Sequence, residues 1–142
     1  MSAMSPGAIE AIRATLERVI ARVNTLSAGG PGWTRPSYGD LESAAHAMAE
    51  EEAHALGMTV RRDAAGNLFA RLKGRDPNAV PLHVGSHLDT VAEGGAYDGQ
   101  AGVAGALALA AGQRRRSLAI SFDEFGHALH GLYGGGVILR EI

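Results

Sequence analysis

The chain of 142 residues has no cysteine, no excess of positive charge and no long apolar run. The absence of cysteine excludes a disulfide framework, a thiolate zinc site and a cysteine nucleophile. The net charge of -2 gives no sign of a nucleic-acid partner. No apolar stretch is long enough to cross a bilayer, so we expect no membrane partner.

What the chain does contain is typical of one soluble domain. Its hydrophobic content of 46% and charged content of 20% are ordinary for a globular protein, and its length is enough for a single core. The first 26 residues mix acids with apolar residues and have no uninterrupted hydrophobic core, so we expect no secretory signal there. A cytoplasmic location is therefore expected.

Helical periodicity predicts two helices in the first part of the chain. Ser5 and Pro6 form a favourable helix start. Apolar residues then recur at helical spacing, at Ile9, Ile12, Leu16, Val19, Val23 and Leu26. Asp40 is expected to cap a second helix that ends at Gly57, with its inner face formed by Leu41, Ala45, Met48 and Leu56. The acids and histidines of this helix are interpreted as its solvated face: His46, Glu50, Glu51, Glu52 and His54.

Strands make up much of the remainder. The sequence predicts strands at 58–62 and 68–72 joined by a turn at 65–67, a strand ending near His87, a helix over 99–111 and a buried strand at 118–122. The apolar residues 137–139 follow three glycines and are expected to pack on the sheet edge or against a partner. Together these elements predict an α/β fold, with helices packed on a mixed sheet.

The residues that carry chemistry lie where the strand near His87 ends. His87 and Asp89 are two residues apart, so on an extended backbone their side chains point to the same face. Asp89 would then bind one ring nitrogen of His87 and leave the other for a cation. A glycine-rich turn delivers Asp98 to the start of the next helix, where the helix dipole favours a carboxylate. Imidazole and carboxylate suit Zn²⁺, Mn²⁺ or Co²⁺, and such a metal would lower the pKa of bound water to about 7.

Ordered motifs along the chain resemble those of a known family. They are WTRPSY at 33–38, GMTV at 57–60, DAAGNL at 63–68, GSHLDTV at 85–91 and GGAYDG at 94–99. The stretch from about Ile12 to Glu124 resembles the N-terminal part of the zinc-dependent hydantoinase/carbamoylase amidohydrolases. This family includes N-carbamoyl-L-amino-acid hydrolases, allantoate amidohydrolases and β-ureidopropionases. The resemblance implies the fold of a di-zinc exopeptidase catalytic domain.

The same resemblance assigns roles to individual residues. It implies that His87 and Asp98 are metal ligands, that Asp89 orients His87 and that Glu124 is the general base. Family members have a glutamate ligand where this chain has Phe125, which cannot coordinate a metal. The implied metal site is therefore incomplete.

Two alternatives would supply the missing ligand. Aligning Asp123 and Glu124 as the acidic pair requires a one-residue deletion, which on a strand exchanges the two faces. His127 and His130 are three residues apart and would share one face of a helix.

The resemblance also implies a missing domain. Family members are longer and carry a smaller second domain that dimerises and closes over the substrate. The resemblance thus implies one truncated catalytic domain over 1–142, with an N-terminal helix in 1–27 and a divergent tail at 127–142.

We therefore predict a metal-dependent amidohydrolase that acts on linear C–N bonds of small carbamoyl or ureido compounds, such as N-carbamoyl amino acids or allantoate. The alternative is a truncated, inactive remnant that has not retained its metal, or an interaction module that depends on a partner. A small-molecule amide is the expected partner, and a homo-oligomer is left open.

Overall fold

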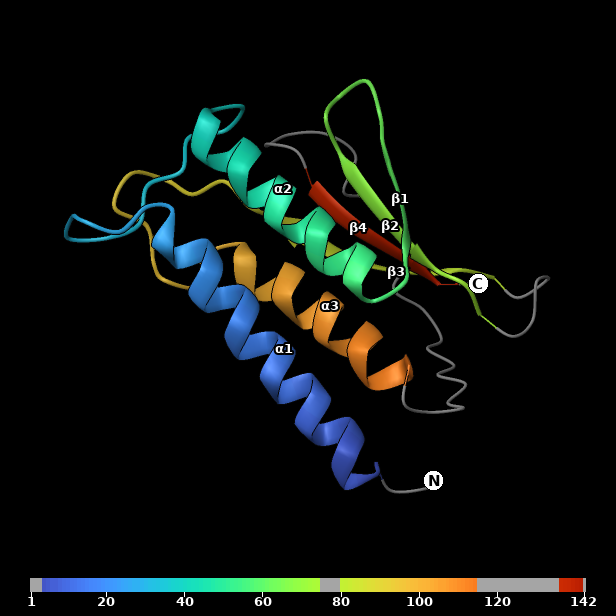
Figure 1. The fold of residues 1–142 in the computed structure, drawn as a ribbon. Helices are drawn as coiled ribbons and strands as arrows, with labels where there is room; N and C mark the ends of the chain where they lie inside the picture. The colour runs from blue at the N-terminus through green and yellow to red at the C-terminus, as the bar shows by residue number, and fades with distance from the viewer. Residues whose placement is uncertain (1–3, 75–79, 115–135, 142) are drawn as a thin grey trace.

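The computed structural model describes residues 4–74, 80–114 and 136–141. Within these ranges, three helices cover one face of a four-stranded sheet (Figure 1). The elements are α1 (Pro6–Thr25), α2 (Asp40–Ala55), β1 (Thr59–Arg62), β2 (Leu68–Leu72), β3 (Leu82–His87), α3 (Gln100–Arg114) and β4 (Gly136–Glu141). Among the described helices, none combines the length and hydrophobicity needed to cross a membrane.

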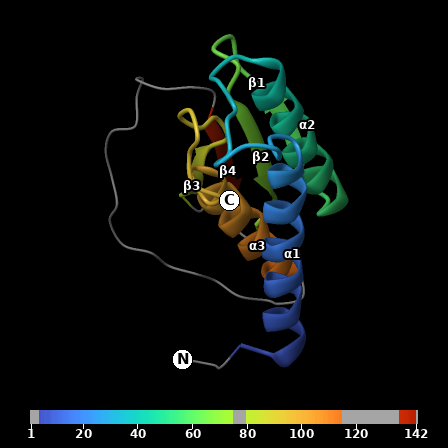
Figure 2. The same ribbon diagram turned by 90° about the vertical axis from the view of Figure 1, so that its left-hand side faces the viewer.

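The helices form two layers above the sheet. Helix α2 packs on β1 and β2, and α3 packs on β3 and β4. Helix α1 lies outside them, mainly against α3, as the turned view shows (Figure 2). Residue 112 of α3 is a glycine, and a Cβ atom there would lie 2.8 Å from the Ile12 side chain, so the two helices meet closely at this point.

The sheet has the strand order β1-β2-β4-β3. Strand β1 is antiparallel to β2, β2 is parallel to β4, and β4 is antiparallel to β3. The predicted mixed sheet covered by helices is thus confirmed.

The position of β4 corrects one expectation. The apolar segment 137–139 does not lie on the sheet edge but between β2 and β3, where Ile138 is opposite both Phe69 and Gly85. An interior strand hydrogen-bonds on both sides, and its apolar sequence suits that position. The strand predicted at 118–122 lies outside the described residues.

Local sequence signals explain how α1 and the β1–β2 hairpin form. The Ser5 hydroxyl accepts a hydrogen bond from the Ala8 backbone N–H at 3.3 Å, which confirms the expected cap. In the hairpin turn, the Asp63 carboxylate accepts hydrogen bonds from the backbone N–H groups of Ala65 and Asn67. The Asn67 side chain also donates to Asp63, at 2.9 Å.

Helix α2 differs from its expectation at both its cap and its inner face. Gly39 is the cap residue and Asp40 is the first helical residue, with no capping hydrogen bond from a side chain. Of the expected inner face, Ala45 is buried but Leu41 is 37% exposed, and the other buried residues of the helix are Glu42, His46, Ala49, Glu52 and Ala53. The alanines let the helix lie close to the core, which carries the polar residues between them into the interior.

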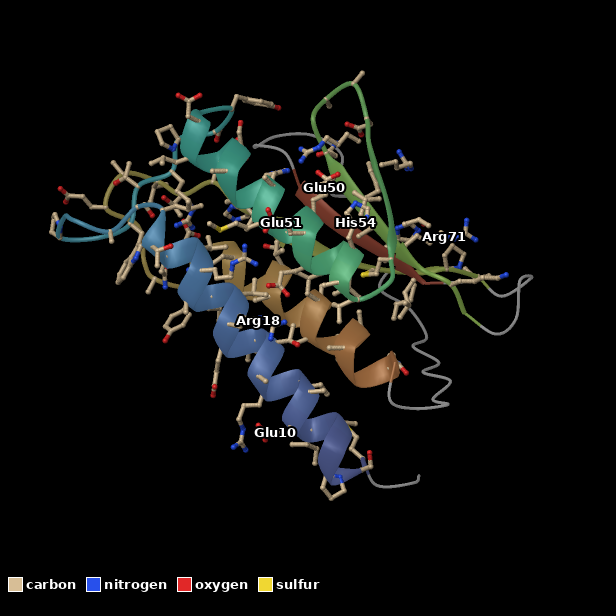
Figure 3. The ribbon with its side chains drawn as sticks, in the orientation of Figure 1. Glu10, Arg18, Glu50, Glu51, His54 and Arg71 are labelled. Atoms are coloured by element: carbon tan, nitrogen blue, oxygen red, sulfur yellow. The ribbon has the colours of Figure 1, made fainter. Side chains whose placement is uncertain are left out.

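The expectation of a solvated charged face on α2 is confirmed for Glu51 and His54, whose side chains are 66% and 58% exposed, and is wrong for His46 and Glu52, which are buried. Glu52 binds Arg18 and Arg22 of α1, with N–O distances of 2.8 Å to each. The Oε1 atom of Glu42 lies 3.8 Å from Nε2 of His46, which is itself buried. Glu50 and His54, in contrast, lie on the side of α2 next to the hairpin (Figure 3).

The core is formed mostly by small and aliphatic side chains from all three helices and from the sheet. Its fully buried members include Val23, Leu68, Leu88, Val103 and Leu107. Leu88 directly follows β3, so the end of that strand is anchored in the core. This anchor fixes the two residues on either side of it, His87 and Asp89.

Candidate metal centre

His87 and Asp89 contact each other at the end of β3. The Nδ1 atom of His87 lies 2.9 Å from Oδ1 of Asp89 and 3.1 Å from the Asp89 backbone oxygen. Both oxygens can only accept hydrogen bonds, so these two contacts favour the tautomer of His87 with its proton on Nδ1. The contact itself was expected from the two-residue spacing, and the functional roles of both residues remain predictions.

The second carboxylate oxygen of Asp89 is held by a different loop. The Ser37 hydroxyl, in the connection between α1 and α2, donates to Oδ2 of Asp89 at 2.5 Å. The Asp89 side chain is 13% exposed, whereas that of His87 is 41% exposed. The carboxylate is therefore fixed from both sides, and the imidazole remains accessible.

The backbone of Gly99, the residue after the second predicted ligand Asp98, packs against His87. Gly99 has φ of +63°, and a Cβ atom there would lie 2.4 Å from Nδ1 of His87. Only glycine combines this backbone conformation with this close approach. Asp98 immediately precedes Gly99, is half-buried and lies just before α3, as the sequence predicted.

The turn that carries Asp98 is tied to α1. The Gln100 side chain donates to Oδ1 of Asn24 at 2.7 Å and also to the backbone oxygen of Ala96. Gln100 is fully buried, so these contacts are shielded from water. The start of α3 is thereby held in place relative to the end of β3.

Two loops frame the site and are joined by reciprocal backbone contacts. Trp33 and Gly94 exchange two backbone hydrogen bonds, at 3.0 and 2.9 Å. The Thr90 hydroxyl donates to the Trp33 carbonyl at 2.9 Å. Glu93, which has a positive φ of 54°, donates its backbone N–H to the Thr34 hydroxyl. The loop before α2 and the loop after β3 therefore form one unit around Asp89.

Arg35 belongs to the loop before α2, and its side chain is fully buried. Its Nε donates to the Leu88 carbonyl at 2.8 Å, and its Nη1 donates to the Ser27 hydroxyl at 2.9 Å. Burial lowers the pKa of Arg35, and the negative charges of Asp98 and Asp89 oppose that shift. Its burial excludes a solvated surface role for this arginine.

The described residues supply only part of a metal-ligand set. Within 4–74, 80–114 and 136–141, no group of three histidine, cysteine, aspartate or glutamate side chains is placed to hold a metal ion. The imidazole of His87 and the carboxylate of Asp98 are groups that bind zinc, but a catalytic zinc ion usually has three protein ligands. The remaining predicted residues, Glu124, Phe125, His127 and His130, lie outside the described residues.

Sequence reasoning did not identify Ser37 or Thr90 as parts of this site. Both lie within the motifs that carry the family resemblance. Their contacts join residues more than 50 positions apart, so local periodicity holds no signal for them.

The chain is similar in sequence to several curated amidohydrolases. It is 41% identical over 95 residues to an N-carbamoyl-L-amino-acid amidohydrolase from Paenarthrobacter aurescens, which covers 67% of this chain and 23% of that protein. It is 37% identical over 93 residues to a ureidoglycolate hydrolase from Arabidopsis thaliana, covering 65% of this chain and 20% of that one. An allantoate amidohydrolase from Bacillus subtilis is 40% identical over 76 residues, which cover 54% of this chain and 18% of that protein.

The fold of this chain is also similar to the folds of solved structures. A hydantoinase/carbamoylase family amidase from Burkholderia ambifaria matches 90% of this chain and 29% of its own, with a TM-score of 0.71 and 29% identity. The structure of AtUAH in complex with glyoxylate matches 89% of this chain and 27% of its own, with a TM-score of 0.69 and 27% identity. No family model matches the chain. The chain spans about a fifth of the length of the curated relatives just described.

Proposed function

Because the chain is related over about two thirds of its length to amidohydrolases of the hydantoinase/carbamoylase family, we propose that it catalyses metal-dependent hydrolysis of linear C–N bonds. The substrates would be small carbamoyl or ureido compounds, the class named by its relatives: N-carbamoyl-L-amino acids, allantoate and ureidoglycolate. A cytoplasmic location stays a prediction.

The arrangement of His87, Asp89 and Gly99 is the observation that supports this proposal. Asp89 engages Nδ1 of His87, and the Asp98–Gly99 turn packs against the same ring. A carboxylate that fixes the tautomer of a histidine is the usual partner of a metal-binding imidazole. We propose His87 and Asp98 as ligands of Zn²⁺, with Mn²⁺ or Co²⁺ as alternatives.

The proposed chemistry divides into what the metal supplies and what the chain does. A bound metal would polarise the scissile carbonyl and acidify water. Asp89 keeps His87 in one tautomer and orientation. Glu124 would take a proton from the attacking water and return it to the leaving nitrogen as the C–N bond breaks.

Ammonia release from the three substrate types, with each metal, tests the proposal. The variants are Glu124→Gln and His87→Ala, with His83→Ala as the matched control because His83 is an exposed histidine on the same strand. Loss of a general base is expected to lower turnover by about 100-fold or more. His87→Ala should abolish metal-dependent turnover, and His83→Ala should leave it unchanged. Turnover that survives His87→Ala would contradict the site assignment.

A second candidate function is a partner-dependent module without activity of its own. The presence of Phe125, which cannot coordinate a metal, where the resemblance places a glutamate ligand favours this alternative. A second copy of the chain or another protein would then complete the site or replace its catalytic role. A defined dimer in sedimentation together with no turnover would support the module, and turnover by the monomer would exclude it.

A further inference from the structure

A polar cavity lies between helix α2 and the β1–β2 hairpin, and the proposed chemistry uses none of its residues. Its volume is about 160 Å³, which is room for several water molecules or one small organic molecule. The loop before α2, the first two turns of α2, the end of β1 and the hairpin turn supply its walls. The lining residues are Tyr38, Glu42, Ser43, His46, Arg62 and Gly66.

Glu42 is a buried part of this lining, and one of its carboxylate oxygens has no hydrogen bond. The side chain is 5% exposed, and its Oε2 accepts a hydrogen bond from the backbone N–H of Tyr38. The Oε1 atom is buried and has no hydrogen-bond donor within the described part of the chain. The Nε2 atom of His46 lies 3.8 Å from Oε1, which is too long for a hydrogen bond. A buried carboxylate oxygen without a donor is costly, because water no longer supplies one.

The charges around the cavity indicate what kind of donor would fit. Arg62 also lines the cavity, but its Nη2 binds the Glu50 carboxylate at 2.8 Å, so its positive charge is shared with that acid. Glu42 therefore favours a ligand that is both cationic and a hydrogen-bond donor, because charge-assisted hydrogen bonds are the strong ones.

The geometry favours an ammonium group over a metal ion. Two ligand atoms of one tetrahedral zinc ion, each bonded at about 2.0–2.1 Å, are about 3.4 Å apart. The 3.8 Å between Oε1 of Glu42 and Nε2 of His46 is wider than this. An N–H donor lies about 2.9 Å from its acceptor, so a nitrogen bound to Oε1 fits without moving either side chain.

We propose that this cavity is a binding site for a primary ammonium group, which donates a hydrogen bond to Oε1 of Glu42. Two sources share this chemistry: a simple amine or ammonium ion, and the amino group of a free amino acid whose carboxylate faces Arg62. The inference does not depend on the proposed function, although the ammonia that such a hydrolysis releases belongs to the same class.

Titration of ¹⁵N-labelled protein with methylammonium chloride, at constant ionic strength and without metal or substrate, tests the site. We expect the amide signals of Tyr38 and Ser43 to shift in a saturable manner, with a Kd of about 5–50 mM, because two non-hydrogen atoms limit the affinity of so small a ligand. Tetramethylammonium has the charge but no N–H donor, and urea has donors but no charge. Both should bind at least about tenfold more weakly. Glycine that binds more tightly than methylammonium would identify an amino acid as the source, and weaker binding would identify a simple amine.

The variant Glu42→Gln removes the carboxylate and should raise the Kd for methylammonium by about tenfold or more. The matched control is Glu51→Gln on the same helix, because Glu51 is exposed and does not line the cavity. It should leave the Kd unchanged. No saturable shift up to about 200 mM methylammonium would mean that the cavity holds water only and would overturn the proposal. Equal binding of tetramethylammonium, or an unchanged Kd in Glu42→Gln, would overturn it as well.

A second variant keeps the proposal falsifiable if Glu42→Gln does not fold. Ser43 is an exposed lining residue, so Ser43→Leu narrows the cavity and leaves the buried carboxylate in place. We expect this variant to weaken methylammonium binding by about tenfold, because the larger side chain takes up the space of the ligand. Wild-type affinity in Ser43→Leu would show that the ammonium group binds elsewhere.

Discussion

Replacing Glu52 with glutamine is expected to weaken the contact between α1 and α2. Glu52 has a side chain that is 7% exposed and accepts three hydrogen bonds. Arg18 donates through Nε at 3.2 Å and Nη2 at 2.8 Å, and Arg22 donates through Nη1 at 2.8 Å. Figure 3 shows Arg18 on α1, together with the neighbouring acid Glu51 on α2. In Glu52→Gln, an amide NH₂ group replaces one of the two carboxylate oxygens. This group is a hydrogen-bond donor, so it would face an arginine N–H without being able to accept its hydrogen bond.

The expected loss follows from the burial of each partner. Removing one side of a fully buried ion pair costs about 3–5 kcal/mol. Here the two arginines are 46% and 37% exposed and can rehydrate, which reduces the penalty. Loss of hydrogen bonds to a charged group costs about 1.5–3 kcal/mol, and we expect Glu52→Gln to lie in that range. The control is Glu51→Gln: Glu51 is 66% exposed and pairs with Arg22 at the surface, so this substitution should cost about 0–1 kcal/mol.

The pH dependence provides a second check on the same residue. Hydrogen bonding to Arg18 holds the pKa of Glu52 below its usual value, burial acts in the opposite direction, and Arg22 adds to the lowering. A carboxylate with a depressed pKa in the folded state stabilises the fold fully above its unfolded pKa of about 4.3. That contribution is lost as the pH falls through the lower, folded pKa, because the unfolded state binds the proton more readily.

Urea unfolding of wild type, Glu52→Gln and Glu51→Gln, followed by circular dichroism at several pH values, measures both effects. The stability difference between wild type and Glu52→Gln should be largest at neutral pH and shrink below about pH 4. A difference that stays constant down to pH 3, or a Glu52→Gln loss no larger than that of Glu51→Gln, would refute the reasoning.

Three further predictions concern the geometry of the site and the sheet. Gly99→Ala forces a Cβ against His87 and an unfavourable positive φ, so it should cost at least about 1–2 kcal/mol in urea unfolding and abolish zinc binding in calorimetry; binding at wild-type affinity would contradict the site. Asp89→Asn should populate the second tautomer of His87, read from its ¹⁵N ring shifts, and an unchanged pattern would show that Asp89 does not set the tautomer. Leu139→Pro removes a backbone donor from the interior strand β4 and should cost about 3 kcal/mol or more in thermal unfolding, whereas a small loss would place β4 at the edge.

Local chemistry made several features predictable. The helix start at Ser5, the hairpin turn at Asp63 and the contact between His87 and Asp89 each depend on residues two to four positions apart. Helix capping, turn formation and the alternation of side chains along a strand all act over that range, so these features can be predicted from the local sequence. The placement of Asp98 at the start of α3 follows in the same way from the glycine-rich turn.

Features that depend on tertiary contacts were not predictable. The burial of Glu52 requires arginines 30 and 34 positions away, and the burial of Arg35 requires a carbonyl 53 positions away. The charge pattern of a helix sequence is the same whether or not distant residues pair with its side chains in the folded protein. That pattern alone therefore does not predict which charged residues are buried. The order of strands is also a property of the whole chain, which is why the apolar segment at 137–139 predicted a strand but not its interior position.

The metal content of the purified protein tests the proposed metal centre most directly. Wild type, His87→Ala and His83→Ala would be loaded with Zn²⁺, dialysed, and measured by elemental analysis. We expect about one zinc ion or more per chain in wild type and His83→Ala, and a ratio near zero in His87→Ala. A ratio near zero in wild type, or a ratio unaffected by His87→Ala, would contradict the metal centre.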